Sequence, residues 1–234
     1  MRTLSVATGT HGRVLIEDPA GEPAGLLVLF HGYGQNAERM LDDVRLIPGA
    51  ASWRLASVQA LHQFYARDST TVLGSWMTRQ DRDLAIADNI EYVDRVVTAI
   101  GDPLTPLVFA GFSQGVAMAY RAGVRGKHPA AGILALAGDI PPELKESRER
   151  DPWPPVLIGV GDKETWYSPA KVDSDRQFLV TSNIPHEIVV FRGGHDWTDE
   201  FRDAAGPWLS STSSALPHPS RARASGPPDP SASV

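Results

Sequence analysis

The sequence predicts an α/β protein built on one mostly parallel sheet with helices on both faces. Two observations carry this prediction. Short, unbroken apolar runs recur along the chain, and amphipathic segments lie between them. An unbroken run that is too short for a helix is typical of a strand buried on both faces, as parallel strands are. The alternation of the two patterns implies crossover connections, which place helices on both sides of the sheet.

The predicted strands begin with an antiparallel hairpin. Residues 3–8 and 12–17 are β-like runs separated by Gly9-Thr10-His11-Gly12, and they predict this hairpin at the edge of the sheet. The run Leu26-Leu27-Val28-Leu29-Phe30 predicts a central strand. The later predicted strands cover residues 54–58, 106–110, 132–137, 156–160 and 186–191.

The clearest predicted helix spans residues 83–100. Its apolar residues are spaced by three or four positions and form one stripe along the helix; they are Ile86, Ile90, Val93, Val97 and Ile100. Two further helices have start signals, which are the cap Asn36 and the pair Ser168-Pro169. The other predicted helices cover residues 36–42, 114–125, 169–180 and 197–209.

The chain length predicts a single domain. The 234 residues suffice to bury a core without disulfides or metals. Residues 1–209 are expected to form this domain, with no internal repeat and no long linker. Residues 210–234 are rich in Ser, Pro, Ala and Arg and poor in apolar side chains, so we expect a disordered tail.

Composition excludes several functions. The net charge of −6 argues against nucleic acid or an anionic lipid surface as a partner. The absence of cysteine excludes disulfides, thiolate metal sites and a cysteine nucleophile. The seven histidines show no metal-ligand spacing, so no metal site is expected. The N-terminus lacks the apolar core of a signal peptide, and no apolar run approaches the ~20 residues of a membrane span, so we expect a cytoplasmic protein.

A candidate nucleophile lies in Gly111-Phe112-Ser113-Gln114-Gly115, which matches the pattern G-x-S-x-G. The pattern alone is weak, but here it follows a predicted strand and precedes a predicted helix, as a nucleophile elbow requires. The glycines are expected because side chains at these positions would collide with the neighbouring strand or helix. The turn would expose the Ser113 hydroxyl above a helix N-terminus, which favours a developing oxyanion.

A serine hydroxyl needs a base, and His195 is the best candidate. Three histidines follow Ser113 before the tail, and His128 and His186 have surroundings typical of a loop or strand residue. His195 follows Gly193-Gly194, between a predicted strand and a predicted helix, where catalytic loop residues commonly lie.

The residue that orients the base is expected to be Asp162, since it follows the strand at 156–160 and precedes His195 in the chain. Asp139 is its main rival. Glu164 and Asp173 are weaker candidates.

Four motifs together resemble the phospholipase/carboxylesterase family of α/β-hydrolases. They spread over about residues 26–209 and occur in the family's order. The motifs are Leu29-Phe30-His31-Gly32-Tyr33-Gly34-Gln35-Asn36, Gly111-Phe112-Ser113-Gln114-Gly115, Gly161-Asp162 and Gly193-Gly194-His195-Asp196-Trp197.

The resemblance implies an α/β-hydrolase fold and an oxyanion hole formed by the backbone N–H groups of Tyr33 and Gln114. Two departures matter. Val116 stands where family members usually have a second glycine. Thioesterase-like members carry a tryptophan-phenylalanine-aspartate stretch where this chain has Gly74-Ser75-Trp76-Met77-Thr78-Arg79-Gln80-Asp81. The chain therefore resembles the esterase-like branch.

The predicted function is hydrolysis of short- to medium-chain carboxylic esters through an acyl-enzyme, with a small-molecule substrate and no metal or organic cofactor. A thioesterase or lysophospholipase using the same residues is the first alternative, and a non-catalytic binding protein is the second. The oligomeric state stays open. Candidate pocket residues are apolar side chains on predicted loops: Phe64, Tyr65, Trp76, Met77, Trp166 and Tyr167.

Overall fold

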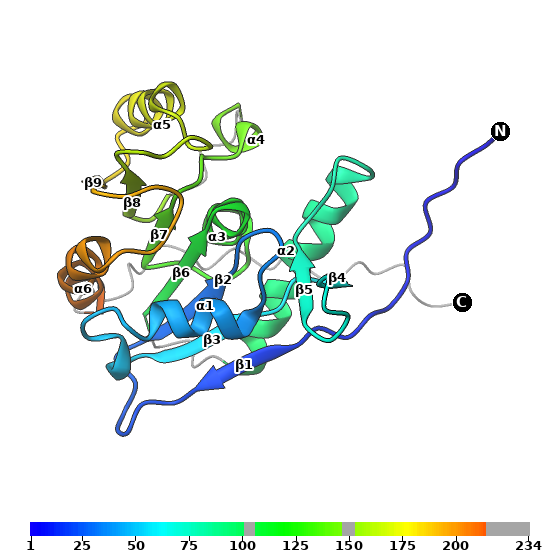
Figure 1. The fold of residues 1–234 in the computed structure, drawn as a ribbon, viewed down its shortest axis with the longest axis horizontal. Helices are drawn as coiled ribbons and strands as arrows, with labels where there is room; N and C mark the ends of the chain where they lie inside the picture. Colours follow the sequence, from blue (N-terminus) through cyan, green and yellow to red (C-terminus); the bar gives the residue numbers. More distant parts are fainter. Residues whose placement is uncertain (101–105, 147–152, 214–234) are drawn as a thin grey trace, which may run out of the picture.

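The computed structural model describes residues 1–100, 106–146 and 153–213, and its main sheet has seven strands. These are β1 (Val14–Glu17), β2 (Leu26–Phe30), β3 (Arg54–Val58), β6 (Leu107–Phe112), β7 (Gly132–Leu136), β8 (Val156–Gly161) and β9 (His186–Phe191). They lie in the order β1-β3-β2-β6-β7-β8-β9 (Figure 1). Every neighbouring pair is parallel except β1 and β3. The predicted fold class is confirmed.

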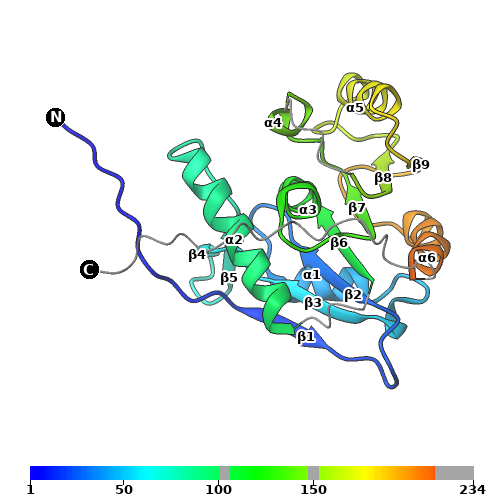
Figure 2. The ribbon, with the colours of Figure 1, turned by 180° about the vertical axis from the view of Figure 1, so that it is seen from behind.

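Helices cover both faces of this sheet (Figures 1 and 2). They are α1 (Ala37–Val44), α2 (Arg82–Ile100), α3 (Gln114–Arg125), α4 (Pro142–Lys145), α5 (Pro169–Thr181) and α6 (Asp199–Ser213), with a short 3₁₀ turn at Ala50–Ser52. Helices α2, α3 and α5 pack against one face, and α1 and α6 pack against the other. In β2, Val28 faces the first group while Leu29 faces the second, which explains why its apolar run is unbroken.

The prediction of an N-terminal hairpin is wrong. Residues 1–13 form no strand, and β1 pairs instead with β3, in the register Val14↔Val58. The segment before β1 lies against α2: the Tyr92 hydroxyl donates to the carbonyl of Arg13 at 3.1 Å, and a Cβ on Gly12 would overlap the Tyr92 ring. Contact with the helix thus replaces the turn that a hairpin would need.

The structure contains a second sheet, of two strands, that the sequence pattern does not predict. It pairs β4 (His62–Tyr65) with β5 (Val72–Ser75) in antiparallel fashion. All four residues of β4 are exposed, so its sequence carries no alternation of buried and exposed positions. Residues 210–213 extend α6 beyond the predicted domain end at 209. The rest of the predicted tail lies outside the described residues.

The parallel strands bring their carboxyl ends to one edge of the sheet, at the top of Figure 1. The segments that follow β2, β6, β8 and β9 therefore meet there, and they contain His31, Ser113, Glu164 and His195. Among the described residues, no helix combines the length and the apolar character needed to cross a bilayer.

Candidate active site

Ser113 occupies a strained turn between β6 and α3. Its backbone has φ 53° and ψ −118°, a conformation that non-glycine residues rarely adopt. A Cβ on Gly111 would lie 2.4 Å from the carbonyl oxygen of Gly115, and one on Gly115 would lie 2.0 Å from that of Phe30. The expected crowding at both glycines is confirmed, and it leaves the serine side chain at the tip of the turn.

The structure brings Ser113, His195 and a carboxylate into one line of contacts. His195 Nε2 lies 2.8 Å from Ser113 Oγ, and His195 Nδ1 lies 2.7 Å from Glu164 Oε2. A carboxylate on Nδ1 selects the tautomer in which Nδ1 carries the proton, so Nε2 can accept the proton of the serine hydroxyl.

The expectation that Asp162 orients His195 is wrong in this geometry. Asp162 is exposed, and its Oδ1 accepts a hydrogen bond from the backbone N–H of Gly193 at 3.0 Å. The chain turns sharply after β8, where the N–H of Glu164 donates to the carbonyl of Gly161 at 3.1 Å. This turn directs the side chain two residues beyond Asp162 toward the imidazole.

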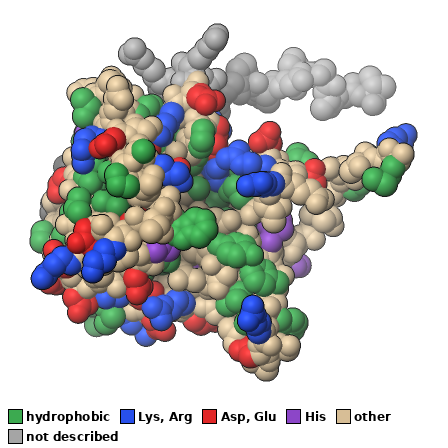
Figure 3. Space-filling model, turned by 45° about the horizontal axis from the view of Figure 1, so that its top comes forward, with side chains coloured by type: hydrophobic (Ala, Val, Ile, Leu, Met, Phe, Trp, Pro, Cys, Tyr) green, Lys and Arg blue, Asp and Glu red, His purple; other side chains and the backbone are tan. Residues whose placement is uncertain are grey.

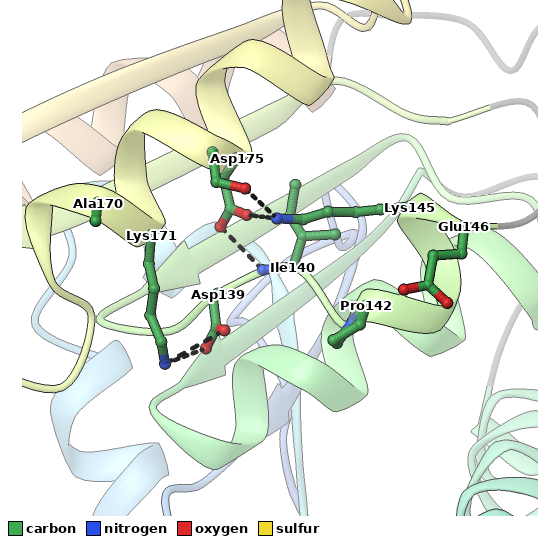
Figure 4. Close-up of a pocket in the computed structure, with 9 residues that line it drawn as sticks. Asp139, Ile140, Pro142, Lys145, Glu146, Ala170, Lys171 and Asp175 are labelled. Carbon is green, nitrogen blue, oxygen red and sulfur yellow. Dashed lines mark hydrogen bonds and ion pairs between the residues drawn. The ribbon is translucent and has the colours of Figure 1, made fainter.

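Asp139, the main rival, is also engaged elsewhere. It pairs with Lys171 at 3.3 Å, beside a cavity of about 410 Å³ between α4 and α5 (Figure 4). Lys145 pairs with the buried Asp175 in the same cavity, so both lysines have carboxylate partners. Glu164 is the carboxylate that contacts His195.

Glu164 is held by the loop that follows it. Its Oε1 accepts hydrogen bonds from the backbone N–H groups of Thr165 at 2.7 Å, Trp166 at 2.7 Å and Tyr167 at 3.4 Å. Burial by itself would raise the pKa of Glu164, but the Trp166 N–H and the His195 ring outweigh it, and the pKa lies below its ordinary value. Glu164 is therefore ionised at neutral pH, with Oε2 free for the imidazole.

The loop that carries His195 is fixed by tight packing. A Cβ on Gly161 would lie 2.4 Å from the carbonyl oxygen of Gly193, so the ends of β8 and β9 approach closely only because of glycine. The ring of Phe112 lies 5.1 Å from the His195 ring and 6.4 Å from that of Trp197. The imidazole thus packs beside the aromatic residue that precedes Ser113.

The resemblance implies an oxyanion hole formed by the backbone N–H groups of Tyr33 and Gln114. Gln114 is the first residue of α3, where helical geometry provides no acceptor for its N–H. Tyr33 lies in the turn after β2, and its N–H has no acceptor among the described residues. A Cβ on Gly32, which precedes Tyr33 in this turn, would lie 3.3 Å from Ser113 Cβ. The turn therefore passes directly beside the nucleophile.

The predicted pocket residues separate into two groups. Trp76 and Tyr167 are buried in the core, 0% and 1% exposed, because partners satisfy their polar atoms: the Trp76 indole donates to His31 O at 2.8 Å, and the Tyr167 hydroxyl donates to Asp175 at 2.9 Å. They cannot line an open pocket, so these two predictions are wrong.

The remaining candidates reach the surface. Phe64, Tyr65 and Trp166 are exposed, and Met77 is half-buried. The Phe64 ring lies 6.0 Å from that of Tyr33, which is itself exposed on the turn beside Ser113. Figure 3, which turns the carboxyl-end side of the sheet toward the viewer, shows hydrophobic side chains gathered across the middle of this face.

The sheet order, the strained serine turn and its contact with a histidine define an α/β-hydrolase fold. The chain matches no family model and no curated protein. Its similarity to solved structures is extensive. Esterase PE8 has a TM-score of 0.66 and 23% identity over 86% of this chain and 98% of its own.

Two other solved structures show the same likeness. Acyl-protein thioesterase 2 of Zea mays has a TM-score of 0.69 and 17% identity over 87% of this chain and 100% of its own. A phospholipase/carboxylesterase from Dyadobacter fermentans has a TM-score of 0.64 and 18% identity over 88% of this chain and 100% of its own. The resemblance predicted from the motifs is confirmed at the level of the fold.

Proposed function

We propose that this protein is a serine hydrolase that cleaves carboxylic esters, with Ser113 as nucleophile, His195 as base and Glu164 as the carboxylate that orients the base. The contact of 2.8 Å between His195 Nε2 and Ser113 Oγ carries this proposal. A hydroxyl becomes an effective nucleophile at neutral pH when a base within hydrogen-bond reach removes its proton during attack. The similar esterase and thioesterase structures support the same class of reaction.

The first half of the reaction forms an acyl-enzyme. Ser113 Oγ attacks the ester carbonyl while His195 Nε2 takes the hydroxyl proton, and Glu164 stabilises the resulting imidazolium. The carbonyl oxygen becomes an oxyanion that accepts hydrogen bonds from the N–H groups of Tyr33 and Gln114. The carbon–oxygen bond to the alcohol then breaks, and the imidazolium gives its proton to the departing oxygen.

The second half releases the acid. Water attacks the acyl carbonyl, His195 takes one proton from it, and the same two N–H groups receive the new oxyanion. The bond to Ser113 Oγ breaks, the serine recovers its proton, and the carboxylic acid departs. Ester and water are thus converted to acid and alcohol, with the enzyme regenerated.

The substrates proposed are small esters with short to medium acyl chains. Tyr33 and Phe64 offer exposed aromatic surface on and beside the turn that passes Ser113, which suits an acyl chain of a few carbons. Trp166 offers a further exposed ring on the loop that holds Glu164. Thioesters and lysophospholipids use the same chemistry with another leaving group, so they belong in the same test.

The test is a substrate panel of nitrophenyl acetate, butyrate and octanoate, an acyl-CoA and lysophosphatidylcholine. The proposal predicts turnover of the nitrophenyl esters that falls by at least about 10³-fold in Ser113→Ala and in His195→Ala. Turnover of acyl-CoA with a higher kcat/KM than any oxygen ester would replace the ester assignment with a thioester one. A higher kcat/KM for lysophosphatidylcholine than for the nitrophenyl esters would replace small esters as the substrate class. Hydrolysis that is unchanged in both variants would reject the serine mechanism.

A further inference from the structure

A short segment at the end of β5 contacts both arms of the candidate oxyanion hole. We name residues 74–77 the β5 bracket. On one side the bracket pairs with the turn that carries Tyr33, and on the other side it binds the side chain of Gln114, the residue after the nucleophile. The two N–H groups are separated by 81 positions in the sequence, so a third element that touches both can fix their relative placement.

The first arm is held by backbone pairing and one indole. The N–H of Gly34 donates to Gly74 O at 3.0 Å, and the N–H of Gly74 donates to Gln35 O at 2.8 Å. Trp76 Nε1 donates to His31 O at 2.8 Å. These three bonds fix both ends of the turn that contains Tyr33.

The second arm is held by an amide side chain. Gln114 Oε1 accepts from the backbone N–H of Trp76 at 2.9 Å, and Gln114 Nε2 donates to Met77 O at 3.1 Å. The amide is used at both ends, so only one orientation satisfies the bracket. The start of α3 is thereby tied to the strand that holds the Tyr33 turn.

The bracket is mostly buried and closely packed. Gly74, Ser75 and Trp76 are buried, and a Cβ on Gly74 would lie 2.8 Å from Gln59 Nε2 and 3.0 Å from His31 Cε1. Burial holds the pKa of His31 below its ordinary value, so this ring is neutral and accepts the Ala60 N–H at 3.2 Å through Nε2. Hydrogen bonds in such buried surroundings are electrostatically stronger than those exposed to water.

We propose that the side chains of Gln114 and Trp76 are positioning residues that set the separation of the Tyr33 and Gln114 N–H groups for the oxyanion. The inference rests on the proposed function, because it gives these side chains a role only in the transition state of acyl transfer. Donors must lie about 2.7–3.1 Å from the oxyanion, and a displacement of ~1 Å can cost about 10²-fold in rate.

The main variant is Gln114→Glu, which retains the acceptor for the Trp76 N–H but places a carboxylate oxygen against Met77 O. Trp76→Phe removes the hydrogen bond to His31 O. Gln114→Met keeps a side chain of similar size that makes neither hydrogen bond of the Gln114 amide. The control is Gln80→Glu, which adds the same charge at an exposed position three residues after the end of the bracket. Each protein is assayed for kcat and KM with nitrophenyl butyrate, for the Ki of an alkyl trifluoromethyl ketone and for its melting temperature.

The bracket predicts a fall in kcat of about 10- to 100-fold in Gln114→Glu, with KM within about threefold of wild type. The trifluoromethyl ketone forms a tetrahedral oxyanion with the serine, so its Ki should rise by a factor similar to the loss in kcat/KM. Trp76→Phe and Gln114→Met should follow the same relation, and Gln80→Glu should change neither value.

Unchanged kcat in folded Gln114→Glu and Gln114→Met overturns the inference while the proposed function stands. A loss of kcat that matches a loss of folded protein, with Ki unchanged in the folded fraction, also overturns it, because it indicates a structural role alone. A wild-type protein that hydrolyses no ester overturns the proposed function, and this inference with it.

Discussion

Glu164 holds His195 through one carboxylate oxygen while the other oxygen is occupied by its own loop. Oε2 lies 2.7 Å from His195 Nδ1, and Oε1 accepts from the N–H groups of residues 165–167. The Glu164 side chain is only 1% exposed. The loop therefore fixes the direction of the carboxylate before any substrate binds, and the imidazole has one orientation that satisfies it.

Replacing Glu164 with Gln should lower kcat for nitrophenyl butyrate by about 10²- to 10⁴-fold, because an amide no longer stabilises the imidazolium and can select the wrong tautomer. The matched control is Asp162→Asn at an exposed position of the same turn, which should keep kcat within about threefold. A larger loss in Asp162→Asn than in Glu164→Gln would return the orienting role to Asp162.

The backbone strain at Ser113 predicts an unusual order of stabilities. Its φ of 53° with ψ −118° costs any side chain about 1–3 kcal/mol, whereas glycine adopts such angles readily. Ser113→Gly should therefore unfold at higher denaturant concentration than Ser113→Ala, by about 1 kcal/mol in the free energy of unfolding. Equal stabilities in a urea titration would indicate that the turn relaxes in solution.

The Asp68 carboxylate reports on the tip of the β4–β5 hairpin. Hydrogen bonds from the Thr71 hydroxyl and from the N–H groups of Thr71 and Thr70 lower the pKa of Asp68 from 3.8 to about 2. A folded-state pKa below the unfolded one means that the stabilisation is present above pH 3.8 and is lost as the pH falls toward 2.

An NMR titration of the Asp68 carboxyl carbon measures this pKa directly. The midpoint should lie near pH 2 in the wild-type protein. It should move upward in Thr71→Val, which loses the hydroxyl hydrogen bond that lowers the Asp68 pKa most. A midpoint at the ordinary value in the wild type would show that the hairpin tip is not closed by these contacts.

The exposed aromatic rings near Ser113 predict a dependence on acyl length. Phe64→Ala should raise KM for nitrophenyl octanoate several-fold and leave KM for the acetate nearly unchanged, since a short acyl group does not extend to the ring. Trp166→Ala tests the exposed ring on the loop that holds Glu164 in the same way, and Val180→Ala serves as an exposed apolar control on α5. Equal effects on both esters in a variant would remove that ring from the acyl surface.

The sequence predicted the central strands well because burial on both faces leaves an unbroken apolar run. It also indicated Ser113 and His195, since glycines are needed around the elbow and in the loop after β9. Position after a strand favours Asp162 over Glu164, because it does not reveal how a turn directs side chains. The turn closed by the Glu164 N–H and Gly161 O sets that direction, and Asp162 instead accepts from the Gly193 N–H, 31 positions away in the chain.

Other differences have the same origin. Trp76 and Tyr167 carry polar atoms on predicted loops, and only their tertiary partners, His31 O and Asp175, make burial favourable. All four residues of β4 are exposed, and this strand is defined only by its pairing with β5. Strand β5 in turn pairs through Gly74 with Gln35, in the turn after β2. Such contacts leave no periodic signal in the sequence.

Labelling with a fluorophosphonate, followed by intact-mass analysis and peptide mapping, tests the central claim most directly. The contact between Ser113 and His195 predicts one covalent adduct per chain on Ser113 in the wild-type protein, slower labelling in Glu164→Gln, and no adduct in Ser113→Ala. An unlabelled native protein, or an adduct that persists unchanged in Ser113→Ala, would contradict the proposed nucleophile.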